Sequence, residues 1–294
     1  MNFEPYLNDA TPWATIDVAP VQTAAVDDHS RWIAQHRHAS MTYMEKYADV
    51  RANPELLLPG ARSMLIALFP YFTDEPLQLP VALYARGEDY HEVVRRRLSD
   101  VAKLLPGETR VCVDTAPLRE RYWAARAGLG FIGRNNQLIA GELGSYFFIG
   151  TILCTAPLPR EIHGITTPPS GNCENCRRCI DACPGKALSE NGAVDARRCL
   201  SYLTIEHRGE FIDGTDLHGC LYGCDVCQRV CPHNANARPT PIPEFHPSPL
   251  LQGLTMQRLA NFTPGDFAAT FRHSAIRRTK LAGLLRNLAA ITRH

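Results

Sequence analysis

The chain has 294 residues, of which 45% are hydrophobic and 21% are charged, a composition typical of a soluble globular protein. Its formal net charge of +1 excludes an overall polycationic character of the kind that drives nucleic-acid binding, but it does not exclude a local basic patch. The first residues hold no basic segment followed by an apolar one, and no apolar run reaches the roughly 20 residues that span a bilayer, so we expect a cytoplasmic protein without signal peptide or membrane anchor.

Helices and strands alternate in the N-terminal part of the chain. We expect a helix over residues 28–48, a buried strand over 63–71, an amphipathic helix over 89–105, a strand over 109–115, a helix over 118–128 and a strand over 144–154. In the second of these helices, the apolar side carries Val93, Val94, Leu98, Val101, Leu104 and Leu105. No glycine-rich dinucleotide fingerprint follows a strand, and no P-loop is present. The alternation predicts an α/β or α+β fold.

Cysteines are concentrated after this region, and nine of the 11 lie between residues 173 and 231. The cytosol keeps thiols reduced, so the pattern favours metal ligation over disulfides. The stretch CENCRRCIDACPG has the C-x2-C-x2-C-x3-C-P spacing of bacterial ferredoxins, and GCDVCQRVCPHN ends in a second Cys-Pro. Four-cysteine zinc sites are the alternative.

Two [4Fe–4S] clusters need eight thiolate ligands, and the ferredoxin pattern predicts that the ligands cross between the two halves. The first cluster is then assigned Cys173, Cys176, Cys179 and Cys231, and the second Cys183, Cys199, Cys224 and Cys227. Cys112 and Cys154 lie in apolar runs and are predicted to be core residues, and Cys220 lies outside the ligand pattern.

Several motifs in order resemble the epoxyqueuosine reductase family. They are VDTAPLRERYWAARAGLGFIGRNNQLI, GSYFFIGTIL, the double ferredoxin pattern with ARRCLSYLTIE, and, further upstream, YADVRANPELLLPGARS and YARGEDYHEVVRRRL. The resemblance covers roughly residues 40–290. It implies an α+β protein with three parts: an α/β cobalamin-binding catalytic domain related to reductive dehalogenases (1–165), a ferredoxin-like double-cluster domain (166–240) and a helical C-terminal region (241–294).

The family's activity, as implied by the resemblance, is reduction of epoxyqueuosine to queuosine at the wobble position of tRNA, with cobalamin, two [4Fe–4S] clusters and an external low-potential electron donor. Asp114 matches the family's proton donor, and burial against the corrin is expected to raise its pKa. The cobalamin contacts carried over by the match are Arg51, Asp114, Gly133, Arg134, Asn135, Leu138, Ser145, Ile149 and Ser201. No D-x-H-x-x-G motif is present, so cobalamin is expected to bind without a protein histidine as its lower ligand.

Each carried-over residue also has a structural interpretation. Asp114 could cap the helix that follows, Arg51 could be a solvated loop residue, and Ser201 could be an ordinary helix residue. The chain stops after the first helix of the family's C-terminal helical region, and a smaller tRNA footprint is therefore expected. For the tRNA phosphates, the basic segments are 95–98, 177–178, 197–198 and 272–280.

Two other functions account for part of the sequence. A reductive dehalogenase-like enzyme would use the same cofactors on a small molecule, without nucleic acid. A ferredoxin-type electron carrier would leave the residues before Cys173 without a role. We expect a monomer with no membrane partner.

Overall fold

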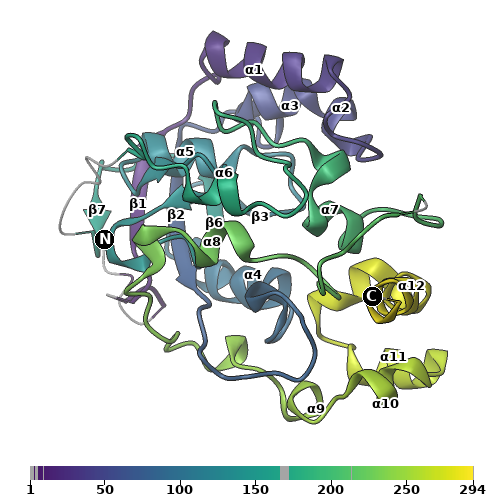
Figure 1. Ribbon diagram of the computed structural model, residues 1–294. Helices are drawn as coiled ribbons and strands as arrows, with labels where there is room; N and C mark the ends of the chain where they lie inside the picture. Colours follow the sequence, from purple (N-terminus) through teal and green to yellow (C-terminus); the bar gives the residue numbers. More distant parts are fainter. Residues whose placement is uncertain (1–2, 4–5, 9, 166–171, 213, 294) are drawn as a thin grey trace.

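The computed structural model describes residues 3, 6–8, 10–165, 172–212 and 214–293 (Figure 1). Its central sheet has the order β3-β6-β2-β1-β7, and every neighbouring pair is antiparallel. The strands are β1 (Trp13–Asp17), β2 (Ser63–Pro70), β3 (Thr109–Val113), β6 (Phe147–Cys154) and β7 (Ile162–His163). The predicted α+β class is confirmed. An α/β N-terminal domain is wrong, because a parallel sheet needs neighbouring strands that run in the same direction.

Strand β2 is buried along its whole length, and its two faces belong to different cores. Leu65, Ala67 and Phe69 face helix α4 (Tyr90–Ala102), whose Val93, Val94, Leu98 and Val101 are buried as predicted. On the other face, Met64, Ile66 and Leu68 pack with Trp123 and Ala124 of α5 (Glu120–Arg126). Leu104 lies beyond the end of α4 and is 52% exposed, so its predicted burial is wrong.

Where one helix was expected over residues 28–48, the chain forms three. They are α1 (Thr23–Ala34), α2 (Tyr43–Lys46) and α3 (Ala48–Ala52). His36 and Ala39 have φ angles of 52° and 54°, in the left-handed region, and no α-helix continues through such residues.

Short elements fill the middle of the chain. Strands β4 (Phe131–Ile132) and β5 (Leu138–Ile139) form a separate two-stranded sheet. The cysteine-rich segment holds α6 (Arg178–Ala182), α7 (Leu200–Ile205) and α8 (Val226–Arg229). Single turns of 3-10 helix lie at Pro54–Leu56, Leu83–Ala85, Gly141–Leu143, Ala196–Arg198, Pro232–Asn234 and Pro243–Phe245.

The C-terminal helices form a third core on the side opposite to β7 (Figure 1). They are α9 (Pro249–Gln252), α10 (Met256–Ala260), α11 (Pro264–Thr270), the 3-10 helix Ala275–Thr279 and α12 (Lys280–Thr292). Leu79, Val81 and Ala85 from the N-terminal part, and Leu221 and Tyr222 from the cysteine-rich part, complete this core. The three regions predicted from the sequence therefore share hydrophobic cores.

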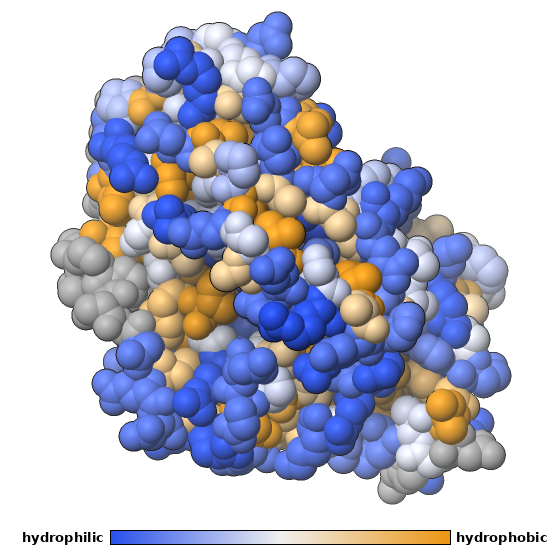
Figure 2. Space-filling view, turned by 90° about the horizontal axis from the view of Figure 1, so that it is seen from above, coloured by the Kyte–Doolittle hydropathy of each residue, from blue (hydrophilic) through white to orange (hydrophobic). Residues whose placement is uncertain are grey.

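Hydrophilic residues dominate the face seen in Figure 2, and hydrophobic residues show among them in small groups. Within the described ranges, no helix combines the length and the apolar character that a membrane crossing requires.

Candidate functional site

Asp114 follows β3 directly and accepts two side-chain hydrogen bonds on one oxygen. Tyr90 Oη donates to Asp114 Oδ2 over 2.9 Å, and His91 Nε2 lies 3.1 Å from the same oxygen. Asp89 Oδ1 holds the other ring nitrogen of His91 at 2.7 Å. The Tyr90 ring is stacked between His91 and Phe148, with centroids 4.0 and 4.2 Å away. These contacts hold Asp89, His91 and Asp114 in a hydrogen-bonded series at the N-terminus of α4.

The backbone of Asp114 is also constrained. Its φ angle is 50°, a left-handed conformation that Asp tolerates better than most residues, and its N–H donates to Glu120 Oε1 over 2.8 Å. Helix α5 begins at Glu120 and is preceded by Arg119, so Asp114 does not cap it. The helix-cap interpretation of Asp114 is therefore wrong.

The protonation of this group differs from the expectation. Desolvation raises the pKa of Asp114, but hydrogen bonds from His91 and Tyr90 and the charges of His91 and Arg121 lower it below its usual range overall. Desolvation lowers the pKa of His91, whereas its hydrogen bonds to Asp114 and Asp89 raise it to about 9. Burial, followed by the charge of Asp114, raises the pKa of Glu120 to about 8. At neutral pH, Asp114 is thus ionised while His91 and Glu120 both carry protons.

Access to Asp114 is one-sided. Its side chain is 59% exposed, yet desolvation is the largest influence on its pKa, so protein surrounds the carboxylate on its other sides. Arg51, in α3, faces the same group, because the charges of Tyr43, Asp114 and Glu120 act on it. Arg51 Nε is buried and has no hydrogen-bond partner among the described residues. Arg51 therefore lies within electrostatic reach of Asp114, and its predicted contact with a cofactor stays a prediction.

Four cysteines from two distant segments line one small internal cavity. They are Cys173, Cys176, Cys179 and Cys231, and Arg134, Asn135 and Ile139 line the cavity with them. The Arg134 backbone N–H donates to Cys173 Sγ over 3.3 Å. Besides desolvation, the charges of Cys173 and Cys231 raise the pKa of the Cys179 thiol, as expected for thiols that face one another.

The other four cysteines also face one another. Desolvation and the charges of Cys224, Cys199, Cys179 and Cys183 raise the pKa of Cys227. Desolvation is also the largest cause of the raised pKa of Cys199, and the charges of Cys224 and Cys183 raise this pKa further. The Ala187 N–H donates to Cys183 Sγ over 3.3 Å, and such bonds to sulfur tune cluster potentials. Among the described residues, no three His, Cys, Asp or Glu side chains converge on a single metal ion.

Cys220, which the ligand pattern leaves out, lies beside the second group. Its thiol hydrogen-bonds to Cys224, and this bond lowers the pKa of Cys224 to about 7. Cys112 and Cys154 are buried, 1% and 0% exposed, in agreement with their predicted core role.

Residues that pack next to the second cysteine group lie close to the Asp114 site. A Cβ on Gly223 would lie 2.5 Å from Ala82 Cβ and 3.2 Å from Tyr84, so the chain before Cys224 is tightly packed there. The Tyr84 ring lies 6.2 Å from the ring of Tyr90, which bonds Asp114. The second cysteine group is therefore adjacent to the Asp114 site through two tyrosine rings.

The remaining carried-over residues occupy three kinds of position. Gly133, Arg134 and Asn135 lie against the cysteine-rich segment, since a Cβ on Gly133 would be 3.6 Å from Cys173 Sγ and Asn135 Nδ2 donates to the Cys227 carbonyl over 3.5 Å. Their loop also reaches the Asp114 neighbourhood, because Arg121 donates to the Asn136 carbonyl. Ser201 is half-buried, and its backbone N–H bonds the Cys199 sulfur.

Leu138, Ser145 and Ile149 are packing residues in this structure. Leu138 is 2% exposed in the core, and half-buried Ile149 packs against that core. Ser145 is 4% exposed; its N–H donates to Asn234 Oδ1 over 2.7 Å, and its hydroxyl accepts from Gln228 Nε2 over 3.1 Å. The expected cofactor contacts of Leu138 and Ser145 stay predictions, and in this structure both side chains are almost fully buried.

Comparisons with known proteins agree with this arrangement. Residues 172–234 match the family model described as 4Fe-4S double cluster binding domain, and residues 51–115 match the model described as Epoxyqueuosine reductase QueG, DUF1730. The chain is 37% identical over 271 residues to the epoxyqueuosine reductase of Leadbetterella byssophila, covering 89% of this chain and 87% of the relative. It is 36% identical over 291 residues to that of Synechocystis sp., covering 93% and 98%.

The chain belongs to the epoxyqueuosine reductase family. Its resemblance to this oxidoreductase family is confirmed, and the double-cluster match identifies the metal centres as [4Fe–4S] clusters rather than zinc sites. A crystal structure of epoxyqueuosine reductase with an epoxyqueuosine-modified tRNA-Tyr stem loop matches with a TM-score of 0.86 at 28% identity, covering 99% of this chain and 79% of that chain. A Bacillus subtilis epoxyqueuosine reductase, solved with its catalytic aspartate loop swung out of the active site, matches with a TM-score of 0.80 at 27% identity, covering 97% and 77%.

Ion pairs neutralise much of the basic character that the sequence displays. The pairs are Arg96 and Arg97 with Glu244, Arg177 with Glu190, Arg197 with Asp195, and Arg278 with Glu206. The side chains of Arg272 and Lys280 are exposed and form no ion pair or hydrogen bond in the described chain, and Arg277 donates only to the Arg272 carbonyl. The surface left for phosphates of a nucleic acid is therefore smaller than the sequence suggests.

Sequence reasoning missed Tyr90, His91 and Glu120 as members of the epoxyqueuosine reductase site. The tripeptide Asp89-Tyr90-His91 was visible, but a helix N-terminus explains an Asp before a helix without any chemistry. Only the antiparallel sheet, which brings the end of β3 to the start of α4, reveals that these side chains share a site with Asp114.

Proposed function

We propose that this chain reduces epoxyqueuosine to queuosine at the wobble position of tRNA, using cobalamin and two [4Fe–4S] clusters fed by an external low-potential donor. The observation that carries the proposal is the Asp114 group, open on one side and adjacent to a double-cluster module. The enzyme is expected to act as a cytoplasmic monomer.

The crossed ligand assignment is part of this proposal. Cys173, Cys176, Cys179 and Cys231 hold the first cluster, and the cavity that all four line supports this assignment. The second cluster is assigned Cys183, Cys199, Cys224 and Cys227, which is supported by their mutual electrostatic influence. We likewise assign residues 1–165, 166–240 and 241–294 to catalytic, ferredoxin-like and helical regions.

The residues around Asp114 fit a bound cobalamin. The buried Arg51 Nε needs an acceptor, and the amide and phosphate groups of cobalamin supply acceptors. Gly133, Arg134, Asn135, Ile149 and Ser201 are candidates for the wall of the same site. When bound, cobalamin supplies a strongly reducing cobalt centre, while the protein supplies orientation and protons.

Removing an epoxide oxygen to leave an alkene consumes two electrons and two protons and releases water. Clusters held by the two cysteine groups would supply the electrons, and two protonated groups, His91 and Glu120, lie beside Asp114. His91 Nε2 bonds Asp114 Oδ2, so a proton can pass along this bond to Asp114 and from there to the epoxide oxygen. Asp114 is thus the acid that contacts substrate, and His91 reprotonates it.

Turnover is expected to fall as the pH rises through the range from about 8 to about 9. Glu120 loses its proton near the lower value and His91 near the upper one, whereas Asp114 stays ionised throughout. Single-turnover rates of chemically prereduced enzyme, measured across this range, test the prediction. Glu120→Gln keeps an acceptor for the Asp114 N–H and should remove only the lower inflection; a rate that stays constant to pH values well above 9 would contradict the proton supply.

Replacing Arg272, Arg277 and Lys280 by Ala is expected to weaken binding of tRNA irrespective of its sequence. Each lost phosphate contact should lower the slope of log affinity against log salt by about one. Filter binding over a range of salt concentrations measures this slope. Arg197→Ala, which removes a guanidinium already paired with Asp195, serves as the matched control. Unchanged affinity in the triple variant would place the phosphate contacts elsewhere.

The deciding experiment is anaerobic turnover of epoxyqueuosine-containing tRNA by the reconstituted enzyme, with nucleosides identified by mass spectrometry. Queuosine formation is the expected result. A protein that holds both cofactors, leaves this tRNA unchanged and reduces organohalides would instead be the dehalogenase-like enzyme.

A further inference from the structure

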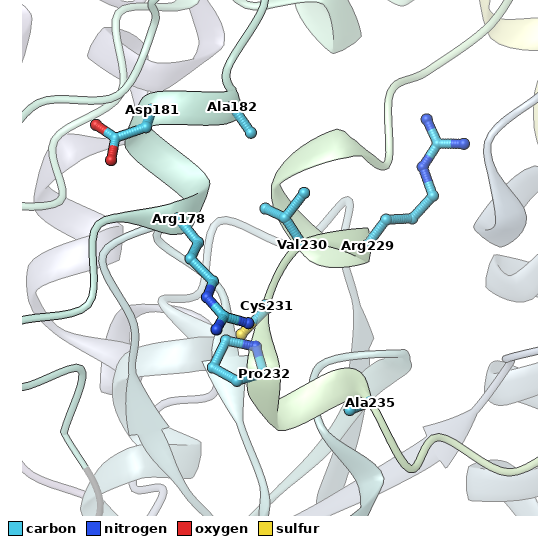
Figure 3. Close-up of a pocket in the computed structure, with 8 residues that line it drawn as sticks. All are labelled: Arg178, Asp181, Ala182, Arg229, Val230, Cys231, Pro232 and Ala235. Atoms are coloured by element: carbon cyan, nitrogen blue, oxygen red, sulfur yellow. The ribbon is translucent and has the colours of Figure 1, made fainter.

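A surface hollow of about 570 Å³ lies between α6 and α8, next to the first cysteine group (Figure 3). Its lining consists of Arg178, Asp181, Ala182, Arg229, Val230, Cys231, Pro232 and Ala235. Arg178, Cys231 and Pro232 also line the internal cavity that holds the other three cysteines of this group. Only this thin wall therefore separates the hollow from the first cluster site.

The hollow has the composition of a protein-docking surface. Ala182, Val230, Pro232 and Ala235 supply apolar lining, and charged side chains surround it. In Figure 3, the Arg178 side chain extends toward Cys231 and Pro232, whereas the Arg229 guanidinium extends away on the far side of Val230. An apolar centre between two cationic groups suits a partner that carries acidic residues around a small apolar contact.

The charge at the rim is positive because its two arginines are unpaired. Neither the Arg178 nor the Arg229 side chain forms an ion pair or hydrogen bond in the described chain, although both are exposed. The acidic member of the rim, Asp181, is partly neutralised by Arg177, whose Nη2 lies 3.4 Å from Asp181 Oδ1. Most neighbouring arginines are paired, for example Arg197 with Asp195.

The position of the hollow matches the direction of electron flow. The second cysteine group is adjacent to the Asp114 site through Tyr84 and Tyr90, and Cys227 links it to Cys179 of the first group. Of the two clusters, the one assigned to the first cysteine group is thus farther from the substrate. Electron transfer weakens steeply with distance, so a donor must dock close to this end.

We propose that the hollow between α6 and α8 is the docking site of the electron donor, a small acidic one-electron carrier protein of the ferredoxin or flavodoxin type. The inference rests on the proposed function, because it takes the clusters as an electron path toward the substrate. One reduced carrier gives one electron to the first cluster and leaves oxidised, so two docking events supply one turnover. Weak, transient interfaces of small area are typical of such encounters.

The test uses the holoenzyme and a reduced plant-type [2Fe–2S] ferredoxin, a low-potential carrier. Arg178→Glu combined with Arg229→Glu should lower the bimolecular rate of cluster reduction, followed by stopped-flow absorbance, by roughly 10-fold or more at low salt. The deficit should shrink at high salt, because screening removes the steering. Titration calorimetry with oxidised ferredoxin should show the same loss of binding. The corresponding double Gln variant should give a smaller loss.

The matched control carries Arg62→Glu with Arg126→Glu, two exposed arginines whose side chains make no ion pair or hydrogen bond in the described chain. It should be reduced at the wild-type rate. Dithionite reduction, iron content and tRNA affinity should be unchanged in every variant. Equal rates in the two double Glu variants would overturn the proposal, as would a loss of tRNA binding with normal ferredoxin reduction. Cluster reduction needs no substrate, so a failure to form queuosine with arginine-dependent reduction intact would refute the proposed function alone.

Discussion

Asp114→Asn is expected to lower queuosine formation by roughly 100-fold to 10,000-fold, the usual contribution of a general acid. The amide matches the carboxylate in shape but cannot relay a proton from His91 to the epoxide oxygen. Asn also tolerates the left-handed backbone that Asp114 adopts, with φ of 50°, so the fold should be retained. Single-turnover rates with prereduced enzyme measure the effect on chemistry.

The control for this variant is Asp100→Asn, which changes an exposed carboxylate of α4 that pairs with Lys103. It should turn over normally. Iron content, cobalamin occupancy and tRNA affinity of Asp114→Asn should match those of the unchanged enzyme. Near-normal turnover by Asp114→Asn with intact cofactors would exclude Asp114 as the acid, since its side chain has no capping role that Asn could preserve.

Cys231→Ser is expected to remove one cluster and leave the other, lowering the iron content from about eight to about four per chain. Cys231 lines the cavity with the three cysteines of the first segment, although it follows them by more than fifty residues in the sequence. Queuosine formation with a protein electron donor should be lost, because the electron path is interrupted at its outer end. Iron and sulfide analysis with EPR of the reduced protein measures the remaining cluster.

Cys220→Ser is the matched control, and it should retain all of the iron. Cys220 bonds Cys224 but lies outside the ligand pattern, so its loss removes a neighbour of the second cluster and no ligand. Iron loss in Cys220→Ser would make Cys220 a ligand. Zinc in place of iron in the anaerobically purified protein would contradict both cluster assignments.

The ferredoxin spacing predicted the double [4Fe–4S] module correctly because the ligands of a cubane obey strict local geometry. Three cysteines at intervals of three residues must face one cluster, and the fourth position is set by the repeat of the motif. The packed strand β2 and helix α4 were predicted equally well, since their burial follows from hydrophobic periodicity.

The environment of Asp114 could not be predicted, because it depends on contacts between residues far apart in the sequence. The carboxylate was expected to be protonated through burial, but His91, 23 residues before it, reverses the direction of the shift. Nor does the sequence reveal that Glu206 forms an ion pair with Arg278, or that the Ser145 N–H donates a hydrogen bond to the side chain of Asn234. Such pairings arise from tertiary packing and leave no local pattern.

The third core combines residues that are synthesised at very different times. Leu79, Val81 and Ala85 are synthesised long before Leu284 and Leu288 of α12. The Asn287 side chain also donates to the carbonyls of Thr204 and Leu221, on either side of the loop before Cys224. During synthesis, the scaffold of the second cluster therefore stays incomplete until α12 has emerged. We therefore expect the second cluster to be held stably only after α12 has been synthesised and has packed against Tyr222.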